Sequence, residues 1–417
     1  MSSAVTTESA GPASPPPGER RWFSLGRLGP AVLVGWLAFD LGLRLIPPEH
    51  LGVSPIVAAQ RFTGRYSPFT AGVSMSAPAG SPGENAVRGN LPPTERRDTP
   101  LHFSTNAFGY RRNPEVSPSE AADVLILGGD SFIYGAGLSD EETLPAALSR
   151  TSGLSVFNGG RSHLLPMRLA DLDWLLIRLP RRPRKAVFVH LEQHRRNVAA
   201  HGSARTEGVL DEARYIRRIV SGNLDVSPLG NLSRRLFRNL ADDIVLPNIY
   251  QDNVEAYTLP DGQPMLFRDF ELFSARNAQD ETEIRSTAEY IVDWVGKLQA
   301  RGLEAHVLIL PSRFTVYGPW LKEDELRAGA LQAAQDLGAL ETLLKENEVK
   351  TINALTVFQS TAAEDLRNRT LPYYREDNHW NPDGVERIAR VLADSLGSRE
   401  AATNAEALVI ERNDALQ

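Results

Sequence analysis

The sequence predicts an α/β fold in which a doubly wound, mostly parallel sheet lies between two helix layers, with an apolar helix near the N-terminus. Three observations lead to this prediction. Short apolar runs recur along the chain, and helical patterns separate them. Strands that alternate with helices form βαβ units, whose strands lie parallel. A chain of 417 residues with 42% hydrophobic and 23% charged residues can also form a sizeable core.

The N-terminal part predicts a tail followed by a membrane anchor. Residues 1–27 have the Ser, Ala, Pro and Gly content of a disordered tail. Residues 28–46 are apolar, and about 19 residues that rise ~1.5 Å each cover ~28 Å, close to the ~30 Å hydrocarbon thickness of a bilayer. We therefore expect one transmembrane helix over residues 28–46.

Charged residues around this segment predict its orientation. Arg20, Arg21 and Arg27 precede it, which places the N-terminus in the cytoplasm and the rest of the chain on the periplasmic or extracytoplasmic side of the cell membrane. Asp40 and Arg44 fall within the segment and oppose insertion. A cleaved signal peptide and a buried core helix are therefore the alternatives.

The remaining chain divides into a linker, a folded domain and a tail. Residues 47–100 are rich in Pro, Gly and Ser with weak periodicity, which predicts a linker or stalk. Ordered signals run over residues 101–398, with an insertion at about 200–280 that carries extra helices and a short hairpin. Residues 399–417 predict a C-terminal tail.

Within the folded domain, four apolar runs have the length and composition of buried strands. They are Val124–Leu127, Leu154–Phe157, Ala186–Leu191 and His306–Leu310. Amphipathic patterns predict helices over Leu144–Arg150, Leu169–Leu179 and Glu283–Gln299.

Composition excludes several classes of function. The net charge of −7 argues against a nucleic-acid binder, which would carry a basic surface. The absence of cysteine excludes disulfides, cysteine-ligated zinc and a thiol nucleophile. We expect no cofactor and no metal.

The first candidate for chemistry is Ser131, which follows the predicted strand Val124–Leu127 within Gly128-Gly129-Asp130-Ser131-Phe132. Ligands of doubly wound sheets bind outside the carboxyl ends of the strands, and helix-start N–H groups there can stabilise an oxyanion. By itself this fragment also fits a helix N-cap, because Asp and Ser are both favoured caps.

A serine nucleophile needs a base and a carboxylate that orients the base. Of the eight histidines, only His379 lies in a loop directly before a final amphipathic helix, which opens at Pro382, and also has a carboxylate, Asp377, two positions away. Both side chains can lean from such a loop into one cleft. A solvated loop that caps the helix is the alternative.

Together these motifs resemble the SGNH (GDSL-like) hydrolase superfamily, which has a flavodoxin-like α/β/α sandwich. The loop Asp377–Gly384, reading DNHWNPDG, resembles in particular the SGNH-like domains of alginate-type polysaccharide O-acetyltransferases. Asn106–Arg111, Val156–Gly160 and Ile309–Tyr317 resemble further segments of this group. The resemblance extends over residues 101–397.

The resemblance implies roles for individual residues. Ser131 is expected as the nucleophile, His379 as the base and Asp377 as the residue that orients it. The oxyanion hole is expected from the N–H groups of Ser131 and Gly160, with Gly159 as an alternative to Gly160. Substrate contacts are expected from Asp130, Asn158, Gln193 and Trp380.

The sequence departs from the family at two points. The family's third block, Gly-x-Asn-Asp, supplies an oxyanion donor, but here the corresponding strand continues into Glu192, Gln193, His194 and Arg195. We expect Arg195, or alternatively Gln193, to donate instead. The alginate enzymes also carry the D-x-H-W element before the serine, whereas this chain has the ordinary hydrolase order.

Other signals favour structural interpretations. His190 and His194 flank Glu192, but HLEQH is not a zinc motif, and the residues before it predict a strand. The basic run Arg178–Lys185 fits a solvated connection better than a polysaccharide grip. Residues 128–137 lack both G-x-G-x-x-G and a P-loop lysine, which argues against a nucleotide site.

The sequence thus predicts a membrane-anchored serine esterase or O-acyltransferase that acts on acyl esters, acetyl esters in particular, of a cell-surface glycan. A membrane protein that donates the acyl group is a possible partner. The alternative is a catalytically inactive glycan-binding or scaffold subunit of a polysaccharide modification or export complex.

Overall fold

Among the residues that the structure describes, five parallel strands form one sheet in the order β4-β3-β5-β8-β9. The computed structural model describes residues 34–36, 38–40, 42, 67–77, 79, 85, 100–116, 122–161, 167–194, 254–276 and 281–397. The five strands are β3 Val124–Gly128, β4 Val156–Asn158, β5 Lys185–Leu191, β8 Glu304–Leu310 and β9 Lys350–Asn353. The expected α/β class with a parallel sheet is confirmed.

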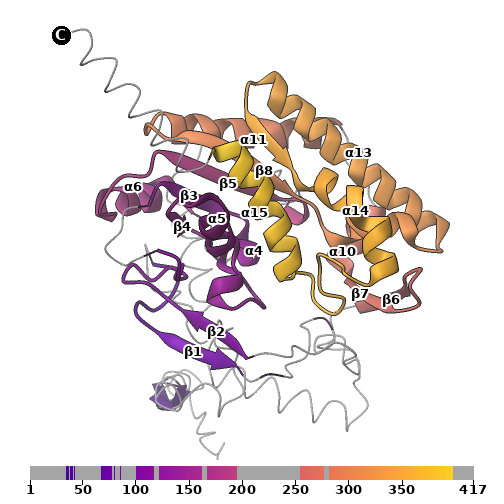
Figure 1. The fold of residues 1–417 in the computed structure, drawn as a ribbon, viewed down its shortest axis with the longest axis horizontal. Coiled ribbons are helices and arrows are strands. Elements are labelled where there is room, and N and C mark those ends of the chain that lie inside the picture. The colour runs from indigo at the N-terminus through magenta and orange to yellow at the C-terminus, as the bar shows by residue number, and fades with distance from the viewer. Residues whose placement is uncertain are drawn as a thin grey trace, which may run out of the picture. The chain divides into compact units, whose positions relative to one another are not determined.

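Helices cover both faces of this sheet (Figure 1). On one face α5 and α15 lie side by side and α14 contacts α15, whereas α11 and α13 pack together on the other. The helices of this part of the chain are α4 Asp130–Tyr134, α5 Leu144–Ser152, α6 Leu169–Arg178, α10 Asp269–Arg276, α11 Glu281–Gln299, α12 Arg313–Tyr317, α13 Asp324–Glu346, α14 Ala354–Asn368 and α15 Pro382–Leu396.

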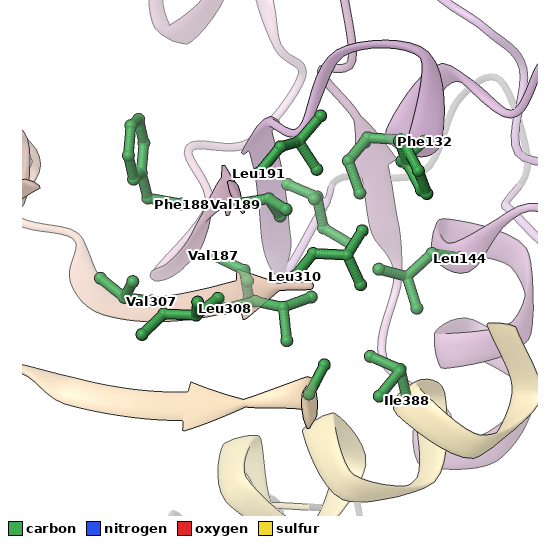
Figure 2. Packing of buried hydrophobic residues seen from close by; sticks show 14 of the residues in the cluster. Phe132, Leu144, Val187, Phe188, Val189, Leu191, Val307, Leu308, Leu310 and Ile388 are labelled. Carbon is green, nitrogen blue, oxygen red and sulfur yellow. The ribbon is translucent and has the colours of Figure 1, made fainter. Parts of the chain in front are cut away.

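Alternation along β5 divides the core between the two faces of the sheet. Phe188 stacks on Trp294 of α11, with ring centroids 5.6 Å apart. Figure 2 shows Leu144 of α5 and Ile388 of α15 on the other side of the sheet, beside Leu310 at the end of β8. Because the central strands are covered on both faces, their sequences are almost entirely apolar.

The strand order places the candidate serine at the point where ligands bind to such sheets. From β3 the chain crosses first to β4 on one side, then returns to β5 on the other side. This is the flavodoxin-like order, and its switch point lies between β3 and β5. Ser131 follows β3 directly, so it lies at this switch point.

A segment that the sequence assigns to the linker is part of the fold. Strand β1 Ser74–Ala77 pairs antiparallel with β2 Leu101–Ser104, and the N–H of Phe69 donates to the Gly109 carbonyl at 2.9 Å. Phe69 is fully buried and contacts the ring of Tyr134 in α4, with centroids 5.5 Å apart. The predicted linker over residues 47–100 is therefore wrong for residues 67–77, because the buried Phe69 and the strand pairing attach them to the domain.

The predicted insertion is described only at its C-terminal end. There β6 Val254–Thr258 and β7 Pro264–Arg268 form an antiparallel hairpin, as expected for a short hairpin in this region. Residues 195–253 lie outside the described residues.

The chain divides into two units, Met1–Pro47 and Pro48–Gln417. In the first unit, residues 34–36, 38–40 and 42 are helical, and the side chains of Val34 and Phe39 are exposed. No helix within the described stretches is both long and apolar enough to cross a membrane. Most of the expected anchor at 28–46 and both expected tails, 1–27 and 399–417, lie outside the described residues, so these remain predictions.

Candidate active site

A sharp turn places Ser131 at the carboxyl edge of the sheet. Gly128, Gly129 and Asp130 all have positive φ, at 73°, 62° and 48°. A Cβ on Gly128 would lie 2.5 Å from the Val189 carbonyl oxygen, so only glycine fits between β3 and β5 there. Asp tolerates the left-handed conformation better than most residues, at a cost of about 1–2 kcal/mol. The chain then enters α4, and Ser131 lies in its first turn.

Ser131, His379 and Asp377 form a continuous hydrogen-bonded chain. The Ser131 Oγ lies 2.7 Å from His379 Nε2, and His379 Nδ1 lies 2.5 Å from Asp377 Oδ1. The same Asp377 oxygen accepts from the His379 backbone N–H at 3.1 Å, which fixes the imidazole in the loop. The structure therefore brings together the three residues that the sequence singled out, across 248 positions of chain.

Asp377 has the electrostatics of an orienting carboxylate. Burial opposes its ionisation, but the charge of His379 and two hydrogen bonds from His379 outweigh burial, so the pKa of Asp377 lies below its ordinary value. An ionised Asp377 accepts from Nδ1–H and leaves Nε2 unprotonated toward Ser131. This tautomer is the one that a general base requires.

Residues 372–381 form the loop that carries His379, the histidine loop, and backbone hydrogen bonds within it hold its shape before α15 begins. The Tyr374 N–H donates to the His379 carbonyl at 3.2 Å, and the Asn381 N–H donates to the Pro372 carbonyl at 3.1 Å. The Asn381 side chain then accepts from the Gly384 N–H at 3.1 Å and caps α15. The amphipathic final helix and its start at Pro382 are thus as expected from the sequence.

Trp380 is corrected from a substrate contact to a core residue. Its side chain is fully buried, and its indole N–H donates to the Phe132 carbonyl at 3.3 Å. The Phe132 ring also contacts the His379 imidazole, with centroids 4.9 Å apart. A ring without exposed surface cannot stack on a substrate, so Trp380 instead joins the histidine loop to the serine helix.

Asn158 is also a buried structural residue, which links α4 to the loop after β4. It is 1% exposed, its amide donates to the Ile133 carbonyl at 2.9 Å, and its Oδ1 accepts from the Gly160 N–H at 3.0 Å. The expected substrate contact is therefore corrected, because both ends of the amide are used inside the protein. Asp130, at 7% exposure, is also largely withdrawn from the surface.

The predicted oxyanion donors are in different situations. The Ser131 N–H lies in the first turn of α4, where N–H groups have no intrahelical acceptor. The Gly159 N–H donates to the Ile126 carbonyl at 2.9 Å and continues the sheet pairing. Gly160 donates to Asn158, so it can serve an oxyanion only by sharing or exchanging that bond. The assignment of Gly160 remains a prediction.

The third block begins with a buried acid rather than a donor. Glu192 follows β5 and is 1% exposed, and its carboxylate accepts from the Ser312 N–H at 2.8 Å and the Thr315 hydroxyl at 2.7 Å. Gln193 is half-buried in the single turn Glu192–His194. Arg195 lies outside the described residues, so its predicted role is not addressed by the structure.

Two other expectations concern metals and basic surfaces. Among the described residues, no three His, Cys, Asp or Glu side chains form a group that could hold a metal ion. Within the basic run, Arg178 lies over the Trp174 ring at 4.5 Å, and Arg181 pairs with Asp123. Both arginines are engaged within the protein.

The sequence did not predict the two residues that hold the histidine loop in place, Arg313 and Glu271. Arg313 and Glu271 form a fully buried ion pair at 2.8 Å, and Arg313 donates to carbonyls of the histidine loop. Glu271 lies in the segment taken as an insertion, and nothing local marks it. The one indication in the sequence is an arginine inside the otherwise uncharged segment Ile309–Tyr317, because a buried arginine needs an acidic or carbonyl partner.

A flavodoxin-like sheet with a Ser-His-Asp chain at its switch point has the arrangement of the SGNH-type serine hydrolases. Residues 264–415 match the family model described as "SGNH hydrolase-like domain, acetyltransferase AlgX". The resemblance to the SGNH-like domains of alginate-type O-acetyltransferases is therefore confirmed over these residues. The matched segment contains Asp377 and His379 but not Ser131. No curated protein matches the chain.

Proposed function

We propose that this protein is a serine-dependent esterase or O-acyltransferase that works through an acyl-enzyme. The observation that carries the proposal is the chain of contacts from Asp377 Oδ1 to His379 Nδ1 and from His379 Nε2 to Ser131 Oγ, at 2.5 and 2.7 Å. In a structural helix cap, nothing would require a His–Asp pair to meet the serine hydroxyl. The match to an acetyltransferase-type domain supports the same class.

The contacts lead to a two-step mechanism. Ser131 Oγ attacks the acyl carbonyl carbon, and its proton passes to His379 Nε2. The bond to the leaving alcohol breaks, and this alcohol takes the proton from Nε2. In the second step, water or a sugar hydroxyl gives its proton to Nε2 and attacks the acyl carbon. The ester bond from this carbon to Ser131 Oγ then breaks, and Oγ takes the proton from Nε2. Hydrolase and transferase differ only in this acceptor.

The finer parts of the proposal concern substrate and place. We propose acetyl esters of a cell-surface glycan as substrates, since the matched family model is that of an acetyltransferase. A membrane partner that donates acetyl groups is compatible with such a role. The proposed anchor at residues 28–46 would place the catalytic domain on the extracytoplasmic side, because arginines precede the apolar segment.

The second candidate is an inactive glycan-binding or scaffold subunit. One observation favours it: Glu192 begins the block in which SGNH enzymes carry an oxyanion donor, and its carboxylate bonds Ser312 and Thr315. A protein of this kind could retain the triad contacts and bind a glycan without turnover. Covalent labelling of the serine separates the two candidates.

The test is intact-mass labelling with a fluorophosphonate, together with hydrolysis of 4-nitrophenyl acetate with and without a glycan acceptor. The wild type should gain one adduct and Ser131→Ala none, with turnover lower by about 10⁴-fold or more. Ser360→Ala is the matched control, because Ser360 lies exposed on α14 and bonds only its own helix in the contacts described. Stoichiometric labelling of Ser131→Ala would refute the nucleophile, and glycan binding by an unlabelled wild type would favour the scaffold.

A further inference from the structure

The backbone of the histidine loop curls around one guanidinium group. Arg313 begins α12, and its side chain has no exposed surface. Its Nη1 lies within hydrogen-bonding distance of three carbonyl oxygens, those of Tyr374 at 2.9 Å, Arg375 at 2.9 Å and Asp377 at 2.7 Å. The convergence of these three carbonyls on one nitrogen restricts the backbone conformation of residues 374–377.

The other edge of the guanidinium is held by Glu271. Arg313 Nε donates to Glu271 Oε1 at 2.8 Å, and Nη2 donates to Oε2 at 3.1 Å. Glu271, in α10, is 1% exposed, and its Oε2 also accepts from the Arg268 N–H at 2.9 Å. The Phe267 ring lies 5.1 Å from the guanidinium carbon. A bidentate pair of this kind fixes the plane of the guanidinium as well as its position.

Stability alone does not account for this arrangement. A buried ion pair is often no more stabilising than apolar residues of the same volume, because desolvation offsets the Coulomb attraction. An apolar pair, however, could not satisfy three converging carbonyls. One of these carbonyls belongs to Asp377, whose carboxylate holds His379, so the guanidinium fixes the backbone of the residue that orients the base.

We infer that Arg313, aligned by Glu271, is a positioning residue that sets the geometry of the Asp377–His379 pair toward Ser131. Its kinetic consequences rest on the proposed function. Neither Arg313 nor Glu271 touches the reacting atoms. Their action is exerted through the backbone of residues 374–377.

The chain offers a matched control on the serine side of the site. Arg111 is also fully buried, pairs with the acid Asp140, and lies over the Phe103 ring at 4.3 Å. It too donates to several backbone carbonyls, those of His102, Tyr134, Gly135 and Leu138. Equal substitutions at the two arginines therefore remove similar contacts at opposite ends of the Ser–His hydrogen bond.

Two substitutions of Arg313 separate the effect of its charge from the effect of its hydrogen-bond geometry. Arg313→Lys keeps the positive charge but replaces a planar fork of five donors by three, so the loop should relax. A displacement near 1 Å costs about 10²-fold in rate, and we expect kcat to fall by about that factor while KM changes little. Arg313→Gln also removes the charge.

The pH dependence of kcat/KM tests the effect of the positive charge on Arg313. Charged groups around the His379 loop include Asp377, Arg375 and Glu376 of the loop itself, Asp261, which pairs with Arg375, Arg313 of α12, Glu271 of α10 and Glu192 after β5. Loss of the positive Arg313 favours the protonated imidazole, so the acid limb of kcat/KM should move to higher pH in Arg313→Gln. It should stay in place in Arg313→Lys and in Arg111→Lys, although Arg111→Lys should lower the melting temperature by a similar amount.

A second readout does not depend on activity. The Nδ1 proton between His379 and Asp377 should give a low-field NMR resonance in the wild type, in Ser131→Ala and in Arg111→Lys. It should be lost or shifted upfield in Arg313→Gln. This result would support the positioning role even if the wild type forms no acyl-enzyme, so failure of the proposed function is recognised separately.

Two outcomes would overturn the inference. One is an Arg313→Lys or Arg313→Gln variant that keeps kcat within about threefold of the wild type and retains the low-field resonance. The other is an Arg111→Lys variant that loses the resonance equally. If Arg313→Gln does not fold, Glu271→Gln gives the same readouts with a smaller fall in kcat, about tenfold, and an unchanged resonance and kcat in that variant would also refute the role.

Discussion

Gly160→Ala tests how tightly the loop after β4 is packed against the serine helix. An added Cβ at Gly160 would lie 2.4 Å from the Tyr134 nitrogen and 2.8 Å from the Ile133 carbonyl carbon. Ordinary van der Waals contact begins at 3.4 Å, so the loop and α4 must separate by about 1 Å. Both contacts are to backbone atoms, which cannot rotate away as a side chain would.

The cost follows from the contacts that would be strained. Overpacking of this kind costs about 1–3 kcal/mol. The separation also stretches the two bonds of Asn158, to Ile133 and Gly160, which contribute about 1 kcal/mol each. The free energy of unfolding should therefore fall by about 3–5 kcal/mol, and at about 2 °C per kcal/mol the melting temperature should fall by roughly 6–10 °C.

Activity should fall as well, whichever side moves. A shift of α4 displaces Ser131 from His379, and a shift of the loop displaces a candidate oxyanion donor. Each change is expected to lower kcat by about 10²-fold. Calorimetry and turnover of 4-nitrophenyl acetate measure the two effects.

Gly338→Ala is the matched control, because Gly338 lies within α13 and a Cβ there meets no atom within 4 Å. This variant should gain about 0.5–1 kcal/mol with unchanged turnover. A Gly160→Ala protein that melts within 1 °C of the wild type would refute the packing argument. A destabilised protein with full kcat would remove this loop from the active site.

Two further predictions concern Arg195, which lies outside the described residues, and the segment 28–46, of which the structure describes only a part. If Arg195 replaces the missing oxyanion donor, Arg195→Ala should lower kcat for an activated acetyl ester by about 10²–10³-fold with little change in KM, and by more than Gln193→Ala does. If neither variant lowers kcat by even tenfold, this block holds no donor. A C-terminal reporter that fluoresces only in the cytoplasm should be dark if residues 28–46 span the membrane, and bright cells would overturn the anchor.

The sequence predicted the three central strands and the edge strand β4, but not the other edge strand, β9. Strands β3, β5 and β8 consist mostly of apolar residues because helices cover them on both sides. Strand β9, Lys350–Asn353, was not predicted, since Ile352 is its only apolar residue and an edge strand needs few. Helices α13 and α14 were also not predicted, although their amphipathic patterns are long enough to detect.

Individual side chains were harder to place than elements. Trp380 follows the candidate base His379 and therefore looks like a substrate contact, yet its burial against Phe132 depends on how α4 meets the histidine loop. Arg313 and Glu271 are 42 positions apart and meet only through the packing of α10 and α12. Such contacts have no local sequence pattern, because they arise between elements that are close only in the fold.

The two halves of the site come from distant parts of the chain, and this bears on what the family match can establish. The matched residues 264–415 contain His379, Asp377 and Arg313, whereas Ser131 and its turn lie outside the match. A chain could keep this segment and still lack a nucleophile. What joins the halves here is a set of specific contacts: His379 to Ser131, the Trp380 indole to the Phe132 carbonyl, and the Tyr374 hydroxyl to the Gly137 carbonyl at 3.3 Å. Because all three contacts link the histidine loop to residues 131–137, the case for catalysis depends on this contact region more than on either half, and Ser131 and Arg313 test it from its two sides.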